Sequence, residues 1–113
     1  MDEYRRTLRR SVDAPVGVFD TLAEETIGRL GNLSETGMLL VAQAPLVEDA
    51  LYQLRFELPG PVPATVELGA HLLWVSEPGG GGLRWAGLRF INVPQAHATT
   101  LRTWLHGGDA PAE

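Results

Sequence analysis

An alternating stretch decides the fold of this chain: Leu51-Tyr52-Gln53-Leu54-Arg55-Phe56-Glu57-Leu58. From Tyr52 onward its large apolar side chains recur at every second residue, with polar side chains between them. Successive side chains of a β-strand point to opposite faces of a sheet, so this pattern predicts an antiparallel strand with one buried face. Pro59-Gly60-Pro61 then ends the strand, because proline has no N–H to donate to a neighbouring strand.

Similar apolar patterns predict five further short strands on either side of this one. They cover Val12–Phe19, Thr26–Leu33, Met38–Ala42, Ala64–Ser76 and Leu83–Val93, and a flexible loop at Gly79–Gly82 joins the last two. The alternation puts Trp74 on the apolar face of its strand, and all three tryptophans (Trp74, Trp85 and Trp104) are expected in the core or on a buried helix face. Six strands joined by short turns indicate a mainly β protein, a small antiparallel barrel or sandwich.

The C-terminal segment changes period. From Pro94 to His106, Ala98, Leu101, Trp104 and Leu105 recur at spacings of three and four, which predicts one amphipathic helix packed on the strands. We therefore expect a single domain at residues 12–106. Residues 1–11 are expected to form a mobile arginine-rich loop, and residues 107–113 a disordered tail.

Composition excludes several classes of protein. The 113 residues contain no cysteine, which leaves no disulfide and no thiolate for a metal or a nucleophile. The chain has neither the roughly 18 consecutive apolar residues of a membrane span nor a signal peptide, so a cytoplasmic protein without membrane contact is expected. The net charge of −5 argues against binding to duplex nucleic acid.

No pattern in the chain indicates an enzyme. Ser34 has no activating base near it in sequence, and His71, His97 and His106 share no metal-ligand spacing with one another or with a carboxylate pair. We therefore expect neither catalysis nor a metal or other cofactor. All nine basic residues are arginines, however, and four of them (Arg5, Arg6, Arg9 and Arg10) lie just before the first predicted strand.

Two features indicate binding. An arginine fork meets phosphate oxygens or the O6 and N7 of guanine in pairs, and it stacks on purines; alone, the cluster also fits a solvated basic tail. The second feature is the turn Gly31–Met38, whose Asn32, Ser34 and Gly37 present an amide, a hydroxyl and a bare backbone between two predicted strands. Alone, it is an ordinary hairpin turn.

Together the two features resemble the PilZ domain, a bacterial receptor family for cyclic di-GMP. The family carries R-x-x-x-R before its first strand and D/N-x-S-x-x-G after its second, and this chain matches with Arg5-x-x-x-Arg9 and Asn32-x-Ser34-x-x-Gly37. Arg6 with Arg10 fits the bare spacing too, but Arg5 and Arg9 place Val12-Asp13-Ala14-Pro15-Val16 at the family's usual distance. Leu72–Val75 and Trp85–Phe90 are similar to its last two strands, so the likeness covers roughly residues 4–106.

The resemblance implies a six-stranded PilZ-type barrel with a C-terminal helix, and cyclic di-GMP held between the N-terminal loop and the barrel. Arg5 and Arg9 are then expected to contact phosphate and guanine, while Asn32, Ser34 and Gly37 shape the opposite wall. Asn32 replaces the commoner aspartate, so a neutral amide stands where the carboxylate usually does. Arg6 and Arg10 are either additional ligands, for a second nucleotide, or solvent-facing.

The function implied is a stand-alone receptor whose N-terminal loop changes conformation on binding. It would signal through an unidentified downstream protein in the control of motility, biofilm formation or virulence. One alternative is a PilZ-like interaction module without nucleotide binding, of the kind related to type IV pili. Another is a small barrel that binds single-stranded nucleic acid, which requires exposed aromatic residues beside basic ones.

Overall fold

A closed antiparallel barrel with one C-terminal helix is the architecture of the chain, as the sequence predicts. The computed structural model describes residues 9–107. Its strands are β1 (Arg9–Ser11), β2 (Gly17–Asp20), β3 (Glu25–Ser34), β4 (Gly37–Ala42), β5 (Leu51–Leu58), β6 (Ala64–Val75) and β7 (Arg84–Asn92). A 3₁₀ turn, η1 (Gly80–Gly82), precedes β7, and the helix α2 (Gln95–Leu105) ends the described fold.

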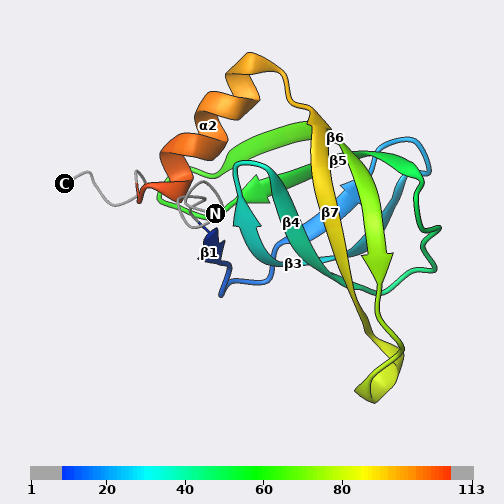
Figure 1. The fold of residues 1–113 in the computed structure, drawn as a ribbon. Helices are drawn as coiled ribbons and strands as arrows, with labels where there is room; N and C mark the ends of the chain where they lie inside the picture. Colours follow the sequence, from blue (N-terminus) through cyan, green and yellow to red (C-terminus); the bar gives the residue numbers. More distant parts are fainter. Residues whose placement is uncertain (1–8, 108–113) are drawn as a thin grey trace, which may run out of the picture.

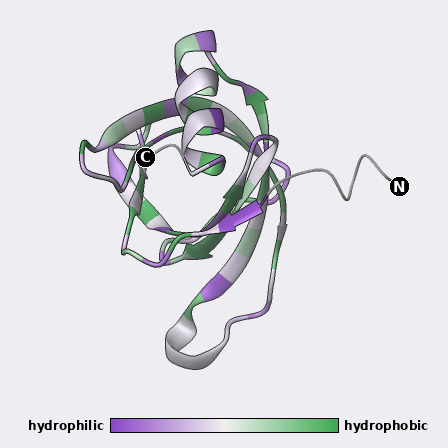
Figure 2. Cartoon of the chain, turned by 90° about the vertical axis from the view of Figure 1, so that its left-hand side faces the viewer, coloured by the Kyte–Doolittle hydropathy of each residue, from purple (hydrophilic) through white to green (hydrophobic). Residues whose placement is uncertain are grey.

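Strand β3 closes the barrel because it pairs with both β2 and β4. The order β3-β2-β5-β6-β7-β4 therefore returns to β3, and every pairing in it is antiparallel. Figure 2 shows the resulting ring of strands with α2 beside it. The β6–β7 hairpin projects away from the ring on the side far from α2 (Figure 1).

The first predicted strand, Val12–Phe19, is wrong in its bounds. The structure divides this region into β1 and β2, which lie one after the other along the same edge of β3. Pro15 stands in the break, where it has no N–H to offer a partner strand. The bounds expected for the N-terminal loop, residues 1–11, also need correction, since Arg9–Ser11 is a paired strand. Residues 1–8 of that loop lie outside the described residues.

The barrel interior holds the alternating side chains that the sequence predicts, including Leu54, Phe56 and Leu58 of β5. The remaining apolar core residues come from the other five barrel strands, from α2 and from the residue just before β2: Val16, Val18, Ile27, Leu30, Leu33, Met38, Leu40, Ala42, Val66, Leu68, Ala70, Leu72, Ala86, Leu88, Leu101, Trp104 and Leu105.

Two of the three tryptophans do not belong to this core, which corrects the sequence interpretation. The register of β6 against β7 shifts between Leu72 and Trp74, and this bulge turns Trp74 outward, where it is 44% exposed. Trp85 is 48% exposed because its neighbour Ala86 takes the inward position on β7. Only Trp104 is buried, as expected.

Helix α2 begins directly after Pro94, whose fixed φ of −55° suits a helix entry. Gly107 follows its end with a φ of +75° and donates its N–H to the Trp104 carbonyl. Leu101, Trp104 and Leu105 face the barrel, and the Trp104 indole Nε1 donates to the Pro59 carbonyl over 3.0 Å. No helix in residues 9–107 is long and apolar enough to cross a membrane.

Candidate functional site

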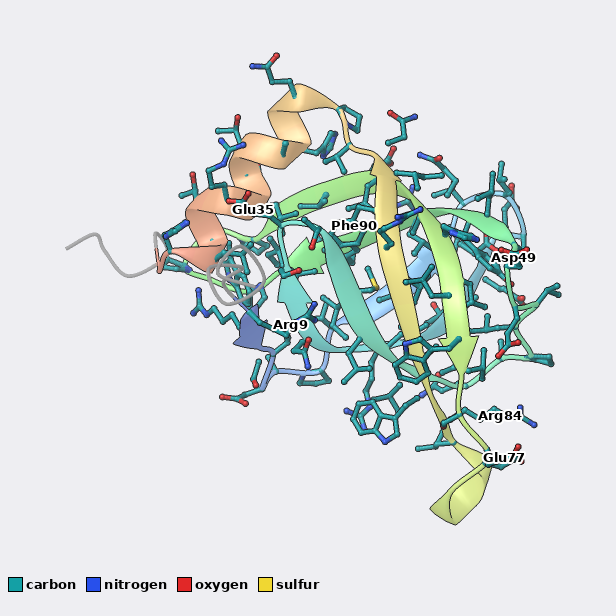
Figure 3. The ribbon with its side chains drawn as sticks, viewed as in Figure 1. Arg9, Glu35, Asp49, Glu77, Arg84 and Phe90 are labelled. Atoms are coloured by element: carbon teal, nitrogen blue, oxygen red, sulfur yellow. The ribbon has the colours of Figure 1, made fainter. Side chains whose placement is uncertain are left out.

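Strand β1 brings Arg9 onto the end of β3. Arg9 lies opposite Ser34 and Ser11 lies opposite Asn32 in the antiparallel pair. Side chains at opposite and diagonal positions of such a pair are within reach of each other. The Arg9 guanidinium accordingly donates from Nη1 to Asn32 Oδ1 and from Nη2 to Ser34 Oγ, the latter over 3.3 Å. Figure 3 labels Arg9 in the side-chain view of the barrel. Residues that stand 23 and 25 positions apart in sequence thus form one polar cluster.

Ser34 holds the turn between β3 and β4 in place. Its Oγ accepts the backbone N–H groups of Thr36 and Gly37, each over 3.2 Å, and the side chain is fully buried. A serine hydroxyl that accepts from the backbone two and three residues ahead is a common device for stabilising a turn. Ser34 is therefore a structural residue of the turn as well as a neighbour of Arg9.

Gly37 is required by close packing of two backbones. A Cβ at this position would stand 2.4 Å from the Leu88 carbonyl oxygen on β7. Its φ is not positive, so a glycine is needed here for the close backbone approach and not for a left-handed conformation. The Asn32–Gly37 turn consequently sits tight against β7, which fixes where Asn32 and Ser34 point.

A shallow cleft of about 340 Å³ opens beside this cluster. It is lined by Arg9, Asn32, Met38, Leu39, Leu73, Trp74, Gly87 and Leu88. Arg9 and Asn32 form its polar side, and the exposed Trp74 forms an aromatic side. The cleft therefore combines a guanidinium, an amide and an indole face within one surface depression.

Trp74 is the site residue that the sequence interpretation missed. The strict alternation assumed for Ala64–Ser76 ignores the adjacent pair Leu73-Trp74, whose two large side chains cannot both face inward from one regular strand. That adjacency was the available signal for an exposed aromatic residue on β6.

Arg10 points away from the cleft and contacts the helix. Its guanidinium lies 3.9 Å from the centroid of the Trp104 ring, and Nη1 donates to the Trp104 carbonyl. Arg10 is thus partly buried against α2, which differs from the solvent-facing arrangement considered for it. Arg5 and Arg6 lie outside the described residues.

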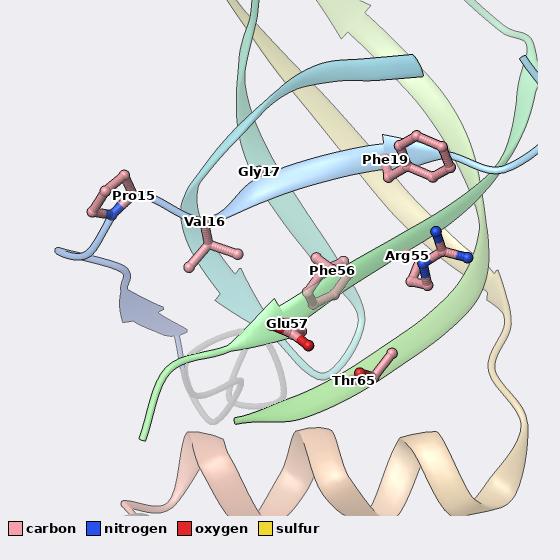
Figure 4. Close-up of a pocket in the computed structure, with 8 residues that line it drawn as sticks. All are labelled: Pro15, Val16, Gly17, Phe19, Arg55, Phe56, Glu57 and Thr65. Atoms are coloured by element: carbon pink, nitrogen blue, oxygen red, sulfur yellow. The ribbon is translucent and has the colours of Figure 1, made fainter. Parts of the chain in front are cut away.

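A second hollow of about 390 Å³ lies on another part of the barrel, between β2 and β5 (Figure 4). Phe19 and Arg55 lie side by side there, with the guanidinium 4.8 Å from the ring centroid. Arg55 also pairs with Glu67 at 3.5 Å, so its charge is already compensated. None of the described motif residues (Arg9, Asn32, Ser34 and Gly37) lines this hollow, and we take the Arg9 cleft as the candidate site.

The arrangement at Arg9 suits binding of a planar, anionic ligand. The guanidinium fork pairs with phosphate or a base edge, and the indole offers a stacking surface. The histidines stand elsewhere: His71 Nε2 is 2.6 Å from Asp49 Oδ1, and His97 Nδ1 accepts the Glu67 N–H. Within residues 9–107, no three histidine, aspartate or glutamate side chains gather as metal ligands.

Comparison with known proteins gives one family and several solved structures of similar fold. The family model described as PilZ domain matches residues 3–107. Among solved structures, Escherichia coli YcgR in complex with cyclic di-GMP is 24% identical, with a TM-score of 0.72 over 91% of this chain and 45% of that chain. The isolated PilZ domain of the same protein, also with cyclic di-GMP, is 21% identical, with a TM-score of 0.70 over 91% and 89%.

Bacillus subtilis MotI/DgrA, described as an inhibitor of motility, is 15% identical, with a TM-score of 0.73 over 91% of this chain and 50% of that chain. The chain thus spans about half the length of YcgR and of MotI. At these identities the structures establish a shared fold. No curated protein matches the sequence.

Proposed function

The chain belongs to the PilZ domain family, and from that premise we propose that it is a receptor for cyclic di-GMP. The observation that carries the proposal is the contact of Arg9 with Asn32 and Ser34. It unites the two sequence motifs of the family in one cluster at the edge of a cleft.

The ligand chemistry follows from the residues around the cleft. Arg9 pairs with a phosphate or with the O6 and N7 of guanine, and Arg5 joins it from the N-terminal segment. The neutral amide of Asn32 both accepts and donates hydrogen bonds, and Ser34 and Gly37 hold the turn against β7. Trp74 stacks on a guanine ring. Arg6 remains a candidate additional ligand, whereas the contacts of Arg10 direct it to α2.

The comparisons support this proposal. Two of the similar structures contain cyclic di-GMP, and a third is named for inhibition of motility. We propose a non-catalytic role in the cytoplasm: binding changes the conformation of the N-terminal arginine segment, and a protein partner reads the change. Control of motility, biofilm formation or virulence is the process expected.

Calorimetric titration of the full chain with cyclic di-GMP tests the proposal. A hydrogen bond to a charged group contributes about 1.5–3 kcal/mol, so Arg9→Ala is expected to weaken binding by roughly 10- to 150-fold. Arg84→Ala is the matched control, because it removes the same charge from an exposed residue that does not line the cleft. Arg84→Ala should keep the wild-type affinity within a factor of about two.

Three outcomes of the titration contradict parts of the proposal. Absence of heat with the wild-type protein overturns it and favours an interaction module without nucleotide binding. Equal losses in Arg9→Ala and Arg84→Ala indicate general electrostatic attraction instead of a defined contact. Loss in Arg6→Ala with none in Arg5→Ala shows that the register chosen for the motif is wrong.

The exposed tryptophans favour a second candidate function. Trp74 and Trp85 stand on the outer face of the barrel, together with Arg29 and Arg89, which is the aromatic and basic pattern of a single-stranded nucleic-acid binder. Titration with a single-stranded oligonucleotide separates the two functions. A receptor for cyclic di-GMP should show no competition from the oligonucleotide at physiological salt.

A further inference from the structure

The C-terminal end of helix α2 contacts the two segments that carry the polar side of the candidate site, β1 and the Asn32–Gly37 turn. On one side, Trp104 holds Arg10, the residue next to Arg9 on β1. On the other side, Arg102 pairs with Glu35, which stands inside the Asn32–Gly37 turn, at 3.4 Å. Figure 1 shows β1 and the β3–β4 turn converging on this end of the helix. Two separate segments of the site are thus connected to one element outside it.

Alternation along β1 explains the first contact. Successive residues of a strand face opposite sides, so when Arg9 points into the cleft, Arg10 points to the helix. Arg10 is held there by the ring and the carbonyl of the same residue, Trp104. The ring is itself fixed, because it is 6% exposed and its Nε1 donates to the Pro59 carbonyl. A buried and anchored indole is a rigid platform for a guanidinium.

The second contact is weaker. The side chains of Arg102 and Glu35 are 54% and 45% exposed, and exposed ion pairs contribute little. The Arg102–Glu35 pair matters because of where it lies: it links α2 to the turn that carries Asn32 and Ser34. The Arg10–Trp104 contact is therefore the principal connection between α2 and the site.

We propose that Arg10 and Trp104 are positioning residues of the nucleotide site, which hold β1 so that Arg9 faces Asn32 and Ser34. This inference rests on the proposed function. β1 is only three residues long and lies beside a closed barrel, so its pairing with β3 alone leaves it weakly held. The contact with Trp104 supplies the missing restraint. By linkage, a ligand that binds Arg9 also stabilises the end of α2, which makes that helix end the surface able to report occupancy.

Hydrogen exchange on the ligand-free full chain tests the positioning directly. The Val12 N–H, bonded to Gly31 O, reports β1, and the Gly37 N–H, bonded to Ser34 Oγ, reports the turn. Arg10→Ala should accelerate exchange at Val12 at least fivefold, with a smaller effect at Gly37. Arg55→Ala is the matched control, since it removes an arginine stacked on Phe19 away from β1. Equal exchange at Val12 in these two variants overturns the inference, whether or not the protein binds cyclic di-GMP.

Titration with cyclic di-GMP then measures the consequence for binding. If only part of the population holds β1 in place, the apparent affinity falls by that fraction, and we expect about a 3- to 10-fold loss in Arg10→Ala. Arg10→Lys separates restraint of β1 from simple attraction of charge. If the planar guanidinium restrains β1, the lysine variant should lose as much affinity for cyclic di-GMP as Arg10→Ala. If Arg10 only supplies positive charge to an anionic ligand, the lysine variant should lose little affinity. The second of these results overturns the positioning role.

A double-mutant cycle completes the test. Trp104 does not line the cleft, so Trp104→Phe should weaken binding only through Arg10. The double variant Arg10→Ala/Trp104→Phe should then bind no more weakly than Arg10→Ala alone. Additive losses overturn the inference. A wild-type protein that binds no cyclic di-GMP ends the proposed function, and the exchange measurement at Val12 still decides whether Arg10 positions β1.

Discussion

Gly87 of β7 lies directly beneath the indole of Trp74 on β6, and a Cβ on Gly87 would stand 2.3 Å from the indole Nε1. The two residues are partners in the strand register, beside the bulge that turns Trp74 outward. The glycine therefore provides the space in which an exposed tryptophan lies flat on the sheet. This arrangement fixes the ring at the edge of the cleft that Arg9 and Asn32 also line.

Substitution of Gly87 should move this ring. Gly87→Ala places a methyl group where the indole now lies, and the side chain has to rotate away, at a cost of about 1–3 kcal/mol in unfolding free energy. Because the displaced ring no longer forms the cleft wall, cyclic di-GMP binding should weaken about as much as in Trp74→Ala. Calorimetry and urea unfolding measure the two effects. Gly80→Ala, where the added Cβ meets nothing within 4 Å, should leave cyclic di-GMP affinity unchanged.

Gly37→Ala should destabilise the barrel and impair the site together. Its Cβ would clash with the Leu88 carbonyl, so the Asn32–Gly37 turn has to move off β7 at a cost of about 1–3 kcal/mol. Gly28→Ala is a matched control, because its Cβ would stand 2.3 Å from the Val41 carbonyl oxygen and neither residue lines the cleft. Thermal unfolding should show similar losses in both variants. Cyclic di-GMP affinity, measured at a temperature well below the unfolding midpoints of both variants, should fall only in Gly37→Ala. An equal fall in both variants would attribute the effect to general destabilisation of the barrel.

Ser34→Ala should cost more stability than an ordinary loss of a surface hydroxyl. The substitution leaves the N–H groups of Thr36 and Gly37 without their acceptor. The Gly37 N–H is buried, and an unsatisfied buried donor costs about 1–3 kcal/mol. Ser76 offers the comparison, since its Oγ also accepts a backbone N–H, from Trp85, at an exposed place where water replaces it. Urea unfolding should give a clearly smaller loss for Ser76→Ala. Equal losses would show that the turn relaxes to solvate its amides.

Much of this fold can be predicted from residue patterns because its strands have one buried face. The alternation of β5 and the spacing of Leu101, Trp104 and Leu105 identify a strand and a helix, and the structure confirms both. The Arg9–Ser34 neighbourhood follows from motif order and family resemblance, although those residues are 25 positions apart. Whether Arg9 or Arg10 faces the cleft depends on which face of β1 each residue takes. The bare R-x-x-x-R spacing leaves this open, and only the family's usual distance to Val12–Val16 favours Arg9.

The parts that could not be predicted depend on single-residue shifts in register. A bulge after Leu72 reverses the faces of the residues that follow. The adjacent pair Leu73-Trp74 signals an exposed large side chain, but it does not show where the alternation is interrupted. Regular alternation therefore predicts Trp74 in the core, although it lies on the surface. The break at Val12–Val16 is similar, since Pro15 interrupts pairing while the apolar periodicity continues. The bulge lies beside the candidate site, and the break follows directly after β1, the strand that carries Arg9.

The two exposed tryptophans give a direct test of where cyclic di-GMP binds. Trp74 and Trp85 are 44% and 48% exposed, so acrylamide should quench the fluorescence of both in the free protein. Only Trp74 lines the Arg9 cleft, and a guanine stacked on it would shield it from the quencher. In Trp85→Phe, where Trp74 is the remaining exposed tryptophan, saturating cyclic di-GMP should therefore reduce quenching to nearly the level of the buried Trp104. In Trp74→Phe, addition of ligand should leave the quenching of Trp85 unchanged. Protection of Trp85 by the ligand would contradict this and place the nucleotide in the neighbouring groove, which Arg29 and Arg84 also line.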